Sequence, residues 1–428
     1  MRIVITSLGS YGDVNPYIGL ALELRRRGHV PVIATSEYYR AYVEREGLEF
    51  FPIRPEIDPA DTNLVANLMD AFRGTELLFR MLGPTVRESY EDLTAAVRGA
   101  DLLITHPITF AAPLVAQKLG LPWASTVLAP ISFFSAHDLP VFPPAPWLHD
   151  WVAGSPVVSR MLVALANRTS RLWLKPVDQL RAELGLPDRG NPILDAQHSP
   201  DLVLALFSRT LGQPQRDWPK NVRVTGPIFY NGPRESGLAP ELEEFLAAGE
   251  PPIVFTLGTA AVAAAGSFYE ESARAVHALG RRAVLLTGSF AANRPRSALS
   301  SDILAVDHAP HDRLMPRAAA TVHQAGAGTL QQALRAGRPM LIVPHAHDQP
   351  DNAYRAEQLG VARIVRPRQY RERRVREELA ALLNGQYNTR AAEIGSIVRA
   401  EEGAVAACDA IEQTFASSVT RAGALHTS

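Results

Sequence analysis

Asp13 is the first residue in the chain whose position suits chemistry. It follows an apolar run, Arg2–Leu8, which predicts a strand, and it precedes a helical pattern over Ile18–Arg27. Open α/β sheets bind their ligands where a strand turns into a helix. We therefore interpret Asp13 as a candidate general base. A contact to a cofactor, or a cap of a helix beginning near Pro16, are the alternatives.

A second set of glycines and polar residues follows a strand in the second half of the chain. This predicted strand ends at His323, Gly326 and Gly328 come next, and Thr329 opens a helix. Backbone N–H groups at a helix N-terminus attract anions, and glycines let a pyrophosphate approach closely. The pattern predicts a phosphate site to which His323 adds a donor, with glycines that serve packing alone as the alternative. Neither GxGxxG nor GxxxxGK[ST] occurs.

The strand after this turn is followed by another polar cluster. Asp348 and Gln349 offer acceptors and donors that suit the hydroxyls of a polyol. Asp351 is expected to cap the helix that begins there. His345 and His347 have no third ligand nearby in the sequence, so no metal site is predicted.

These turns belong to an alternation of strands and helices that starts twice along the chain. Apolar strands without polar alternation indicate a parallel sheet covered by helices, so we expect an α/β protein with two doubly wound halves. The predicted parts are an N-terminal domain over 1–207, a linker rich in turn residues over 208–249, a C-terminal domain over 250–389, a helical region over 390–416 that could pack back on the N-terminal domain, and a disordered tail over 417–428.

The expected elements have these bounds. The strands are Arg2–Leu8, Val30–Thr35, Leu102–Thr105, Trp123–Val127, Pro252–Leu257, Arg282–Thr287, Ile303–Val306, Ala320–His323 and Met340–Val343. The helices are Pro16–Arg27, Tyr38–Gly47, Thr109–Gly120, Phe268–Leu279, Thr329–Ala336 and Asp351–Leu359.

The composition excludes several classes of function. The 428 residues carry 43 basic and 44 acidic side chains, so there is no basic footprint for a nucleic acid. The single cysteine, Cys408, excludes an internal disulfide and a cysteine cluster for a metal. No apolar window of about 18 residues could span a membrane. We expect a cytoplasmic protein without stable membrane insertion, acting as a monomer or homodimer.

Taken together, the motifs resemble a known family. Gly12-Asp13-Val14-Asn15-Pro16, His323-x-x-Gly-x-Gly-Thr329 and Asp348-Gln349 are similar to motifs of the family 1 glycosyltransferases, which have the GT-B fold and use nucleotide sugars. The branch it resembles most is that of the bacterial rhamnolipid rhamnosyltransferases. Shared features are His198-Ser-Pro200, Arg216-Asp-Trp-Pro219, Leu286-Thr-Gly288 and Ala346–Ala353. The likeness covers about residues 1 to 365 and weakens across Glu56–Leu180, where the acceptor is expected.

The resemblance implies a role for each matching residue in binding the donor. The diphosphate would be held by His323, Gly326, Gly328, Thr329 and Thr259, and the sugar hydroxyls by Asp348 and Gln349. The base and ribose would lie at His308, Ala309 and Gln331. Many relatives have an aromatic ring where His308 stands and a glutamate where Gln331 stands. An amide does not demand both ribose hydroxyls, so UDP- and dTDP-linked donors both stay open, and no cofactor besides this co-substrate is expected.

The resemblance also implies the reaction. Asp13 would take the proton of an acceptor hydroxyl as that hydroxyl displaces the nucleotide, which inverts the anomeric centre and needs no metal. We expect a lipophilic small-molecule acceptor, such as a polyphenol, polyketide or hydroxy-lipid, in a pocket formed by Tyr11, Phe110, Phe133 and Phe134, although these rings could instead be core. The alternatives are a catalytically silent auxiliary protein and a nucleotide-sugar 2-epimerase on the same fold.

Overall fold

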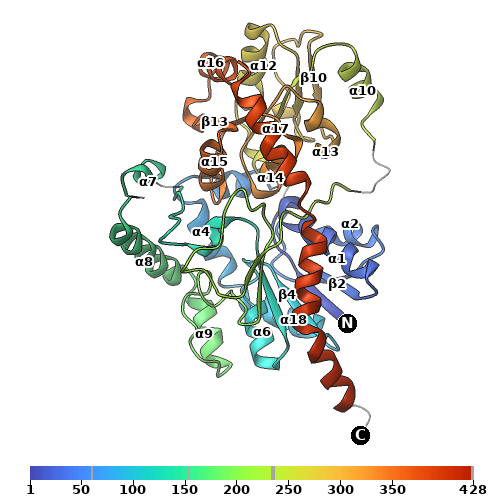
Figure 1. The fold of residues 1–428 in the computed structure, drawn as a ribbon, viewed down its shortest axis with the longest axis vertical. Coiled ribbons are helices and arrows are strands. Elements are labelled where there is room, and N and C mark those ends of the chain that lie inside the picture. The colour runs from blue at the N-terminus through green and yellow to red at the C-terminus, as the bar shows by residue number, and fades with distance from the viewer. Residues whose placement is uncertain (59–60, 144, 153, 233–236, 426–428) are drawn as a thin grey trace.

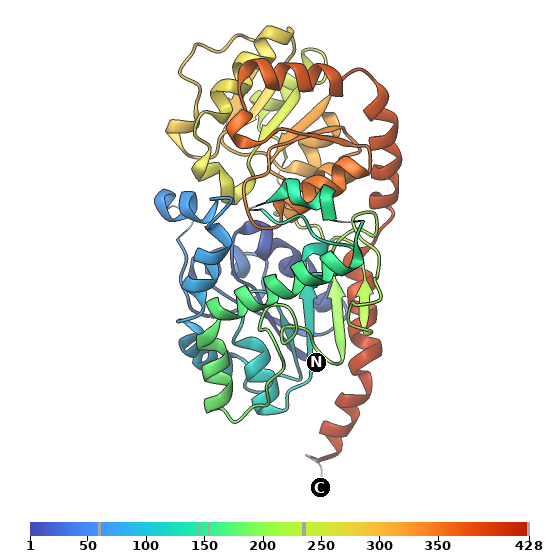
Figure 2. The same ribbon diagram turned by 90° about the vertical axis from the view of Figure 1, so that its left-hand side faces the viewer.

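Two domains, each a parallel sheet between layers of helices, lie one above the other along the long axis of the molecule (Figure 1, Figure 2). The computed structural model describes residues 1–58, 61–143, 145–152, 154–232 and 237–425. This arrangement confirms the predicted α/β class with two Rossmann-like halves.

The N-terminal sheet has seven strands in the order β3-β2-β1-β4-β5-β6-β7, all parallel. The middle strands are buried on both faces, since Ile3 and Leu102 on one face and Val4 and Leu103 on the other have no exposed surface. Helix-covered parallel sheets need such strands. The strands are β1 (Arg2–Thr6), β2 (Val30–Thr35), β3 (Glu49–Pro52), β4 (Leu102–Thr105), β5 (Trp123–Val127), β6 (Leu202–Ala205) and β7 (Val222–Val224).

The C-terminal sheet has six parallel strands in the order β10-β9-β8-β11-β12-β13. In both sheets the strand order reverses beside the first strand of the domain, between β1 and β4 and between β8 and β11. Ligands bind at such switch points. The strands are β8 (Ile253–Thr256), β9 (Ala283–Leu286), β10 (Ile303–Val306), β11 (Ala320–His323), β12 (Met340–Ile342) and β13 (Ala362–Ile364).

The helices cover both sheets and add an extra layer on the N-terminal domain. The N-terminal helices are α1 (Tyr11–Arg26), α2 (Arg40–Glu44), α3 (Thr62–Leu68), α4 (Gly74–Leu82), α5 (Val86–Ala96), α6 (Ala112–Leu119), α7 (Pro146–Val152), α8 (Pro156–Trp173) and α9 (Lys175–Glu183). The later helices are α10 (Pro240–Ala247), α11 (Gly258–Ala261), α12 (Phe268–Leu279), α13 (His311–Leu314), α14 (Ala327–Ala336), α15 (Gln349–Gln358), α16 (Glu372–Leu382), α17 (Gln386–Arg399) and α18 (Gly403–Leu425). Short 3₁₀ turns include η1 (Glu37–Tyr39), η2 (Pro130–Phe133) and η3 (Val262–Ala264).

The last helix crosses from the C-terminal domain to the N-terminal one. Helix α18 runs down beside α1 (Figure 1), and Cys408 and Ile411 are buried in the core of the N-terminal domain. Arg27 at the end of α1 forms ion pairs with Asp409 and Glu412 of α18, at 2.7 and 2.8 Å. The C-terminal helix therefore ties the two domains together.

Two predicted boundaries need correction. The segment 208–249 is not a linker throughout, because β7 lies within it and pairs with β6 as the edge strand of the N-terminal sheet. Turn residues on both sides of this three-residue strand hide it in the sequence. The tail predicted from residue 417 is also wrong in part, because α18 continues to Leu425. Residues 426–428 lie outside the described part of the chain.

Within the described ranges, no helix combines the length and the apolar character that crossing a membrane requires.

Candidate active site

A cavity of about 600 Å³ lies between the two domains, at the carboxyl ends of both sheets. Its walls come from the turns after β1 and β4 on one side and after β8, β11 and β12 on the other, and α3, α4 and α8 complete it. These turns flank the switch points of the two sheets. The sequence thus places residues that are hundreds of positions apart around one space.

Asp13 lies in the first turn of α1 and lines this cavity. The helix begins at Tyr11, five residues before the predicted start, and Ser10 is its N-cap. Asp13 Oδ2 accepts hydrogen bonds from Ser10 N at 2.8 Å and Ser10 Oγ at 3.0 Å, which forms a capping box. The predicted cap role is therefore corrected in position, since Asp13 supports the cap from the third helical residue.

Gly9 makes room for this carboxylate. Its φ of +124° is left-handed, and a Cβ there would lie 2.5 Å from Asp13 Oδ2. Any larger residue at position 9 would displace the carboxylate. Asp13 Oδ1 has no hydrogen bond to a described residue, so this oxygen is available to a ligand in the cavity.

His106, in the turn after β4, is the nearest basic group to that free oxygen. Its Nε2 lies 3.6 Å from Asp13 Oδ1, and its side chain is 3% exposed. The backbone N–H of Ile108 donates to His106 Nδ1 at 3.3 Å. Nε2 is buried and has no hydrogen-bond partner among the described residues.

The N-terminus of α14 forms the opposite wall. Gly326 is its N-cap and has no side chain to satisfy the first N–H groups, and Gly326, Ala327, Gly328 and Thr329 all line the cavity. Gly328 faces Gly12 of α1 so closely that a Cβ on Gly328 would lie 3.7 Å from the Gly12 backbone. The helix thus presents unsatisfied N–H groups and the positive end of its dipole to the cavity. Thr259, after β8, lines the same wall.

His323 lies behind that turn rather than on the cavity wall. It is fully buried, Ala325 N donates to its Nδ1 at 3.1 Å, and its Nε2 is buried without a partner in the described structure. Burial lowers the pKa of His323 to about 3. The ring is therefore neutral at physiological pH and carries its proton on Nε2. Its expected contact with a diphosphate stays a prediction.

Asp348, the N-cap of α15, and Gln349, its first residue, both line the cavity. Burial, and then the charge of Asp13, raise the pKa of Asp348 to about 7. Asp348 Oδ2 accepts from Asn352 Nδ2 at 2.7 Å. Gln349 Oε1 accepts from His345 N at 2.8 Å, which leaves its amide NH₂ as the group that faces a ligand.

Asp351 is not the cap of α15. It is fully buried, accepts from Val141 N at 3.0 Å and forms an ion pair with Arg355 at 2.7 Å. Arg355 also binds Asp138 at 2.8 Å. Because Asp138 and Val141 belong to the N-terminal domain, this buried cluster joins the two walls of the cavity.

The residues expected at the base and ribose do not line this cavity. Gln331 is buried, accepts from Ser208 N at 2.8 Å and donates to Leu206 O at 3.3 Å. Its amide is therefore engaged by the backbone of the N-terminal domain, and the expected ribose contact stays a prediction. His308 and Ala309 lie after β10, outside the cavity wall.

Of the four aromatic rings predicted to form the acceptor pocket, one lines the cavity. Phe134 lines the cavity. Tyr11 instead packs edge-on against Tyr39 and Tyr42, with ring centroids 5.1 and 4.9 Å apart. Phe133 stacks on Trp218 at 4.0 Å. Phe133 is therefore a core residue, and Tyr11 is partly buried and packs against the core.

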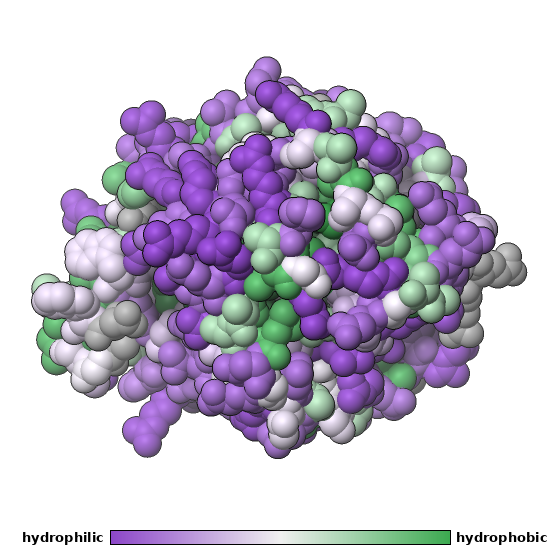
Figure 3. Space-filling view, turned by 90° about the horizontal axis from the view of Figure 1, so that it is seen from above, coloured by the Kyte–Doolittle hydropathy of each residue, from purple (hydrophilic) through white to green (hydrophobic). Residues whose placement is uncertain are grey.

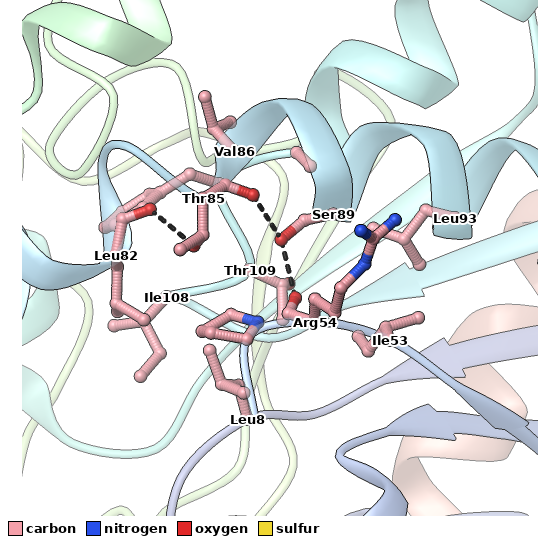
Figure 4. Close-up of a pocket in the computed structure, with 13 residues that line it drawn as sticks. Leu8, Ile53, Arg54, Leu82, Thr85, Val86, Ser89, Leu93, Ile108 and Thr109 are labelled. Atoms are coloured by element: carbon pink, nitrogen blue, oxygen red, sulfur yellow. Dashed lines mark hydrogen bonds between the residues drawn. The ribbon is translucent and has the colours of Figure 1, made fainter. Parts of the chain in front are cut away.

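Phe110 lines a separate small pocket of about 20 Å³ beside α5. Figure 4 shows this pocket, where Ser89 Oγ donates to Thr85 O and Arg54 O. It has room for a molecule the size of water and no more. Phe110 is therefore also a core residue.

Apolar side chains from the inserted helices and from the turn between α3 and α4 form the wall facing the donor side. They are Val65, Leu68, Met69, Phe72, Leu78, Phe79, Leu162, Leu165 and Trp173. Neither lysine nor arginine is found among the described residues lining the cavity. An uncharged, apolar molecule fits this wall.

Helix α8 also carries apolar residues on its outer face. Val157, Met161, Leu165 and Leu172 are each more than half exposed, and Trp151 of α7 is 83% exposed. In Figure 3, pale and green atoms gather at the left, where Figure 1 places α7 and α8, while hydrophilic residues cover much of the rest of this face. Because Leu165 also lines the cavity, the exposed apolar face continues into it.

Comparison with known proteins identifies the family. Residues 3–112 match the model of the glycosyltransferase family 28 N-terminal domain, and residues 284–408 match that of the erythromycin biosynthesis protein CIII-like C-terminal domain. The chain is 33% identical over 428 residues to O-mycaminosyltylonolide 6-deoxyallosyltransferase of Streptomyces fradiae, covering 96% of this chain and 97% of that protein. The chain belongs to the family 1 glycosyltransferases.

Solved structures share the GT-B fold of this glycosyltransferase. Glycosyltransferase VinC, in complex with dTDP, has a TM-score of 0.70 at 20% identity, covering 97% of this chain and 100% of that one. The spinosyn rhamnosyltransferase SpnG, complexed with thymidine diphosphate, has a TM-score of 0.67 at 19% identity, covering 96% and 100%. The resemblance to the rhamnolipid branch stays a prediction.

Among the cavity residues of the glycosyltransferase that lie outside the predicted ligand sites are Ser10, His106, Gln324 and His347. The sequence contains a signal for Ser10, because Ser10-x-x-Asp13 has the spacing of a capping box. His106 directly follows the strand that pairs with β1, so the switch-point rule points to it once the strand order is known. His347 has a left-handed φ of 58°, which no sequence pattern reveals.

Metal ligation has no support in the described part of the chain, where no group of three or more His, Cys, Asp or Glu side chains could hold an ion.

Proposed function

We propose that this enzyme transfers a sugar from a nucleoside diphosphate to a hydroxyl of a lipophilic small molecule, with inversion at the anomeric carbon. The observation that carries the proposal is that one cavity brings together the free Oδ1 of Asp13 and the uncapped N-terminus of α14. A proton acceptor and an anion site on opposite walls are what a direct displacement needs.

The diphosphate binds at the first turn of α14. N–H groups of Ala327, Gly328 and Thr329 donate to its oxygens, and the helix dipole stabilises the charge that develops on the leaving nucleotide. These groups are fixed before the reaction, so no reorganisation is needed as the bond breaks. Thr259 adds a hydroxyl from the neighbouring turn.

The sugar lies between this turn and Asp348. The carboxyl of Asp348 and the amide NH₂ of Gln349 bind hydroxyls of the ring, while Met69, whose Sδ is 3.9 Å from Gln349 Nε2, offers an apolar surface. A carbon without a hydroxyl suits that surface. This supports a deoxyhexose, in line with the 6-deoxyallosyl group in the name of the Streptomyces fradiae relative.

We assign dTDP as the nucleotide. The VinC and SpnG structures contain thymidine diphosphate. Gln331 is occupied by the backbone of Leu206 and Ser208, so no side chain at position 331 selects a ribose diol. The donor expected first is therefore of the dTDP-rhamnose type, with UDP-glucose as the competitor.

The acceptor enters past α8 and lies on the apolar wall. Its hydroxyl approaches the anomeric carbon from the side of Asp13, whose Oδ1 takes the proton as the new C–O bond forms and the bond to the diphosphate breaks. The apolar wall and the exposed face of α8 support a polyketide or a molecule of similar character.

A direct test incubates the protein with dTDP-rhamnose or UDP-glucose, with and without a macrolide aglycone, a flavonoid or a hydroxy-fatty acid. Mass spectrometry detects transfer, and NMR of the product gives the anomeric configuration. Acceptor-dependent transfer with inversion supports the proposal. Formation of an epimer without acceptor indicates a 2-epimerase, and tight donor binding without turnover indicates a silent auxiliary protein; either result overturns it.

A further inference from the structure

The geometry around Asp13 points to a second residue in the reaction. We propose that His106 is a positioning residue, whose Nε2–H holds Oδ1 of Asp13 in the direction of the acceptor hydroxyl. This inference rests on the proposed function of Asp13 as the base. It adds a role for a histidine that the capping box and the donor site leave unexplained.

The tautomer of His106 follows from its other nitrogen. The Ile108 backbone N–H donates to Nδ1 at 3.3 Å, and a donor can point at that nitrogen only when it carries no proton. The proton is therefore on Nε2, the nitrogen 3.6 Å from Asp13 Oδ1. Nε2 is buried and finds no other partner among the described residues.

A buried donor without a partner costs free energy, so this histidine gains from turning to Asp13 Oδ1. The separation of 3.6 Å is longer than a hydrogen bond, and a small rotation of either side chain closes it. The ring itself is held from the side, because it packs edge-on against Tyr17 with centroids 5.5 Å apart. Tyr17 in turn is anchored by a hydrogen bond of 2.5 Å to Thr126.

The carboxylate needs such a contact because only one of its oxygens is fixed. Ser10 holds Oδ2 through two hydrogen bonds, while Oδ1 is left to rotate toward the cavity. A carboxylate oxygen has two lone pairs, so Oδ1 can accept from His106 and still take the acceptor proton. Fixing a reacting atom is worth a large factor, since a displacement of about 1 Å can cost about 100-fold in rate.

No other described group duplicates this contact. The titratable groups that face the Asp13 carboxylate come from α1, η1 and the turns after β4 and β12: Tyr17, Tyr39, His106, His347 and Asp348. Tyr39 donates to Gly9 O at 2.9 Å, Tyr17 bonds Thr126, and His347 Nδ1 bonds Thr75 at 3.3 Å. Of these groups only His106 combines a free donor with a measured approach to Oδ1.

Two conservative variants separate positioning from support of the local turn. In His106→Gln the amide nitrogen takes the place of Nε2, so the donor to Asp13 is kept and the contact with Ile108 N is lost. In His106→Asn the amide oxygen takes the place of Nδ1, so the contact with Ile108 is kept and the donor is lost. We expect kcat of His106→Gln within about 3-fold of the wild type and kcat of His106→Asn lower by about 10-fold or more, with KM for both substrates little changed.

The test measures kcat and KM with the donor and acceptor that the transfer assay identifies. It also measures the affinity for dTDP by calorimetry and the Tm of each variant. His198→Gln is the control and should keep the wild-type kcat, because this partly buried histidine stacks on Phe133 and does not line the cavity. If kcat of His106→Asn equals the wild-type value or exceeds that of His106→Gln, the histidine only supports the turn and the inference is overturned. Equal losses in both variants overturn it as well.

A double-mutant cycle distinguishes failure of this inference from failure of the proposed base. Asp13→Asn/His106→Asn should be no slower than Asp13→Asn alone, because a positioning residue acts through the group it positions. If the two losses instead multiply, His106 acts independently of Asp13. If Asp13→Asn itself is as active as the wild type, the proposed function of Asp13 fails, whatever His106 does.

Discussion

The donor wall of the cavity consists of turns that directly follow strands, whereas the acceptor wall consists mostly of helices that the sheet does not require. Gln324, Gly326 to Thr329 and His347 to Gln349 line the donor wall and offer backbone N–H groups and a few polar side chains. The α3, α4 and α8 helices line the acceptor wall with aliphatic and aromatic side chains. Donor chemistry is thus tied to the fold itself, and acceptor chemistry depends on inserted segments that can change without disturbing it.

Residues with strained backbone conformations lie in or next to the same cavity. The non-glycine residues with left-handed φ in the described chain are Phe134, Ala325 and His347. Phe134 and His347 line the cavity, and Ala325 lies between Gln324 and the N-cap Gly326. Such conformations persist only where the surroundings enforce them. Both walls therefore hold their ligand-facing turns in place before any ligand arrives.

Removing the proposed base should have the largest effect. Asp13→Asn keeps an oxygen for the Ser10 N–H and so preserves the capping box, but an amide cannot take a proton. We expect kcat to fall by about 100-fold or more, with dTDP affinity unchanged. Steady-state kinetics and calorimetry check this.

The matched control for that variant is Asp61→Asn. Asp61 caps α3 by accepting from Asn63 N and Leu64 N, and it does not line the cavity. Asparagine caps helices as well as aspartate, so this variant should behave as the wild type. Full activity of Asp13→Asn would return Asp13 to a purely structural place in the capping box.

Damage to the donor wall should come next. Thr329→Val removes a hydroxyl that lines the cavity while it keeps the shape of the side chain. The loss of one hydrogen bond to a charged diphosphate should raise the donor KM by about 10-fold and leave the acceptor KM unchanged. Thr329→Ser, which restores the hydroxyl, should return the donor KM to near the wild-type value. If the two variants have the same donor KM, Thr329 does not bind the donor.

The sequence predicts the donor wall better than the acceptor wall for a physical reason. Glycines and hydroxyl residues directly after a strand signal an anion site through local geometry alone, and β11, which leads to this turn, has the predicted bounds. An acceptor ring, by contrast, is defined by what it packs against. Phe133 stacks on Trp218, 85 positions away in the chain, and neither residue reveals that partner.

The role of a polar residue is hard to predict for the same reason when its side chain hydrogen-bonds a backbone group that is distant in the sequence. Gln331 looks like a ligand residue because it follows the glycine turn, yet its amide bonds Leu206 and Ser208 of the other domain. Asp351 looks like a cap, yet it binds Arg355 and Val141 N. Sequence spacing shows that such a side chain will be near a site, and only the tertiary structure shows which buried group it serves.

A charge on the acceptor wall should affect the acceptor alone. Leu165 and Val157 lie on the same helix and are similarly exposed, 60% and 65%, but only Leu165 lines the cavity. Leu165→Glu should raise the acceptor KM by about 5-fold, because a carboxylate opposes an apolar ligand, and leave the donor KM unchanged. Val157→Glu is the control and should leave both constants at their wild-type values. Equal effects of the two variants would mean that the acceptor does not pass Leu165.

The smallest effect concerns stability at the donor wall. The pKa of Asp348 is raised to about 7 by burial first and by the charge of Asp13 second, against an ordinary value of 3.8. Between these values the folded state binds a proton that the unfolded state has lost, so the contribution of this group to stability falls as the pH rises from about 4 to about 7. Above that window the folded protein carries a buried carboxylate at its full cost.

Asp348→Asn removes this dependence, because an amide is neutral throughout and its oxygen can still accept from Asn352 Nδ2. The variant should therefore have a Tm a few degrees above the wild type at pH 8, and the difference should shrink as the pH falls and vanish near pH 4. Thermal unfolding followed at pH 4, 5.5 and 8 measures it. A Tm difference that stays constant with pH would show that Asp348 is ionised in the folded enzyme across the whole range, and the donor wall would then carry a permanent negative charge facing the sugar.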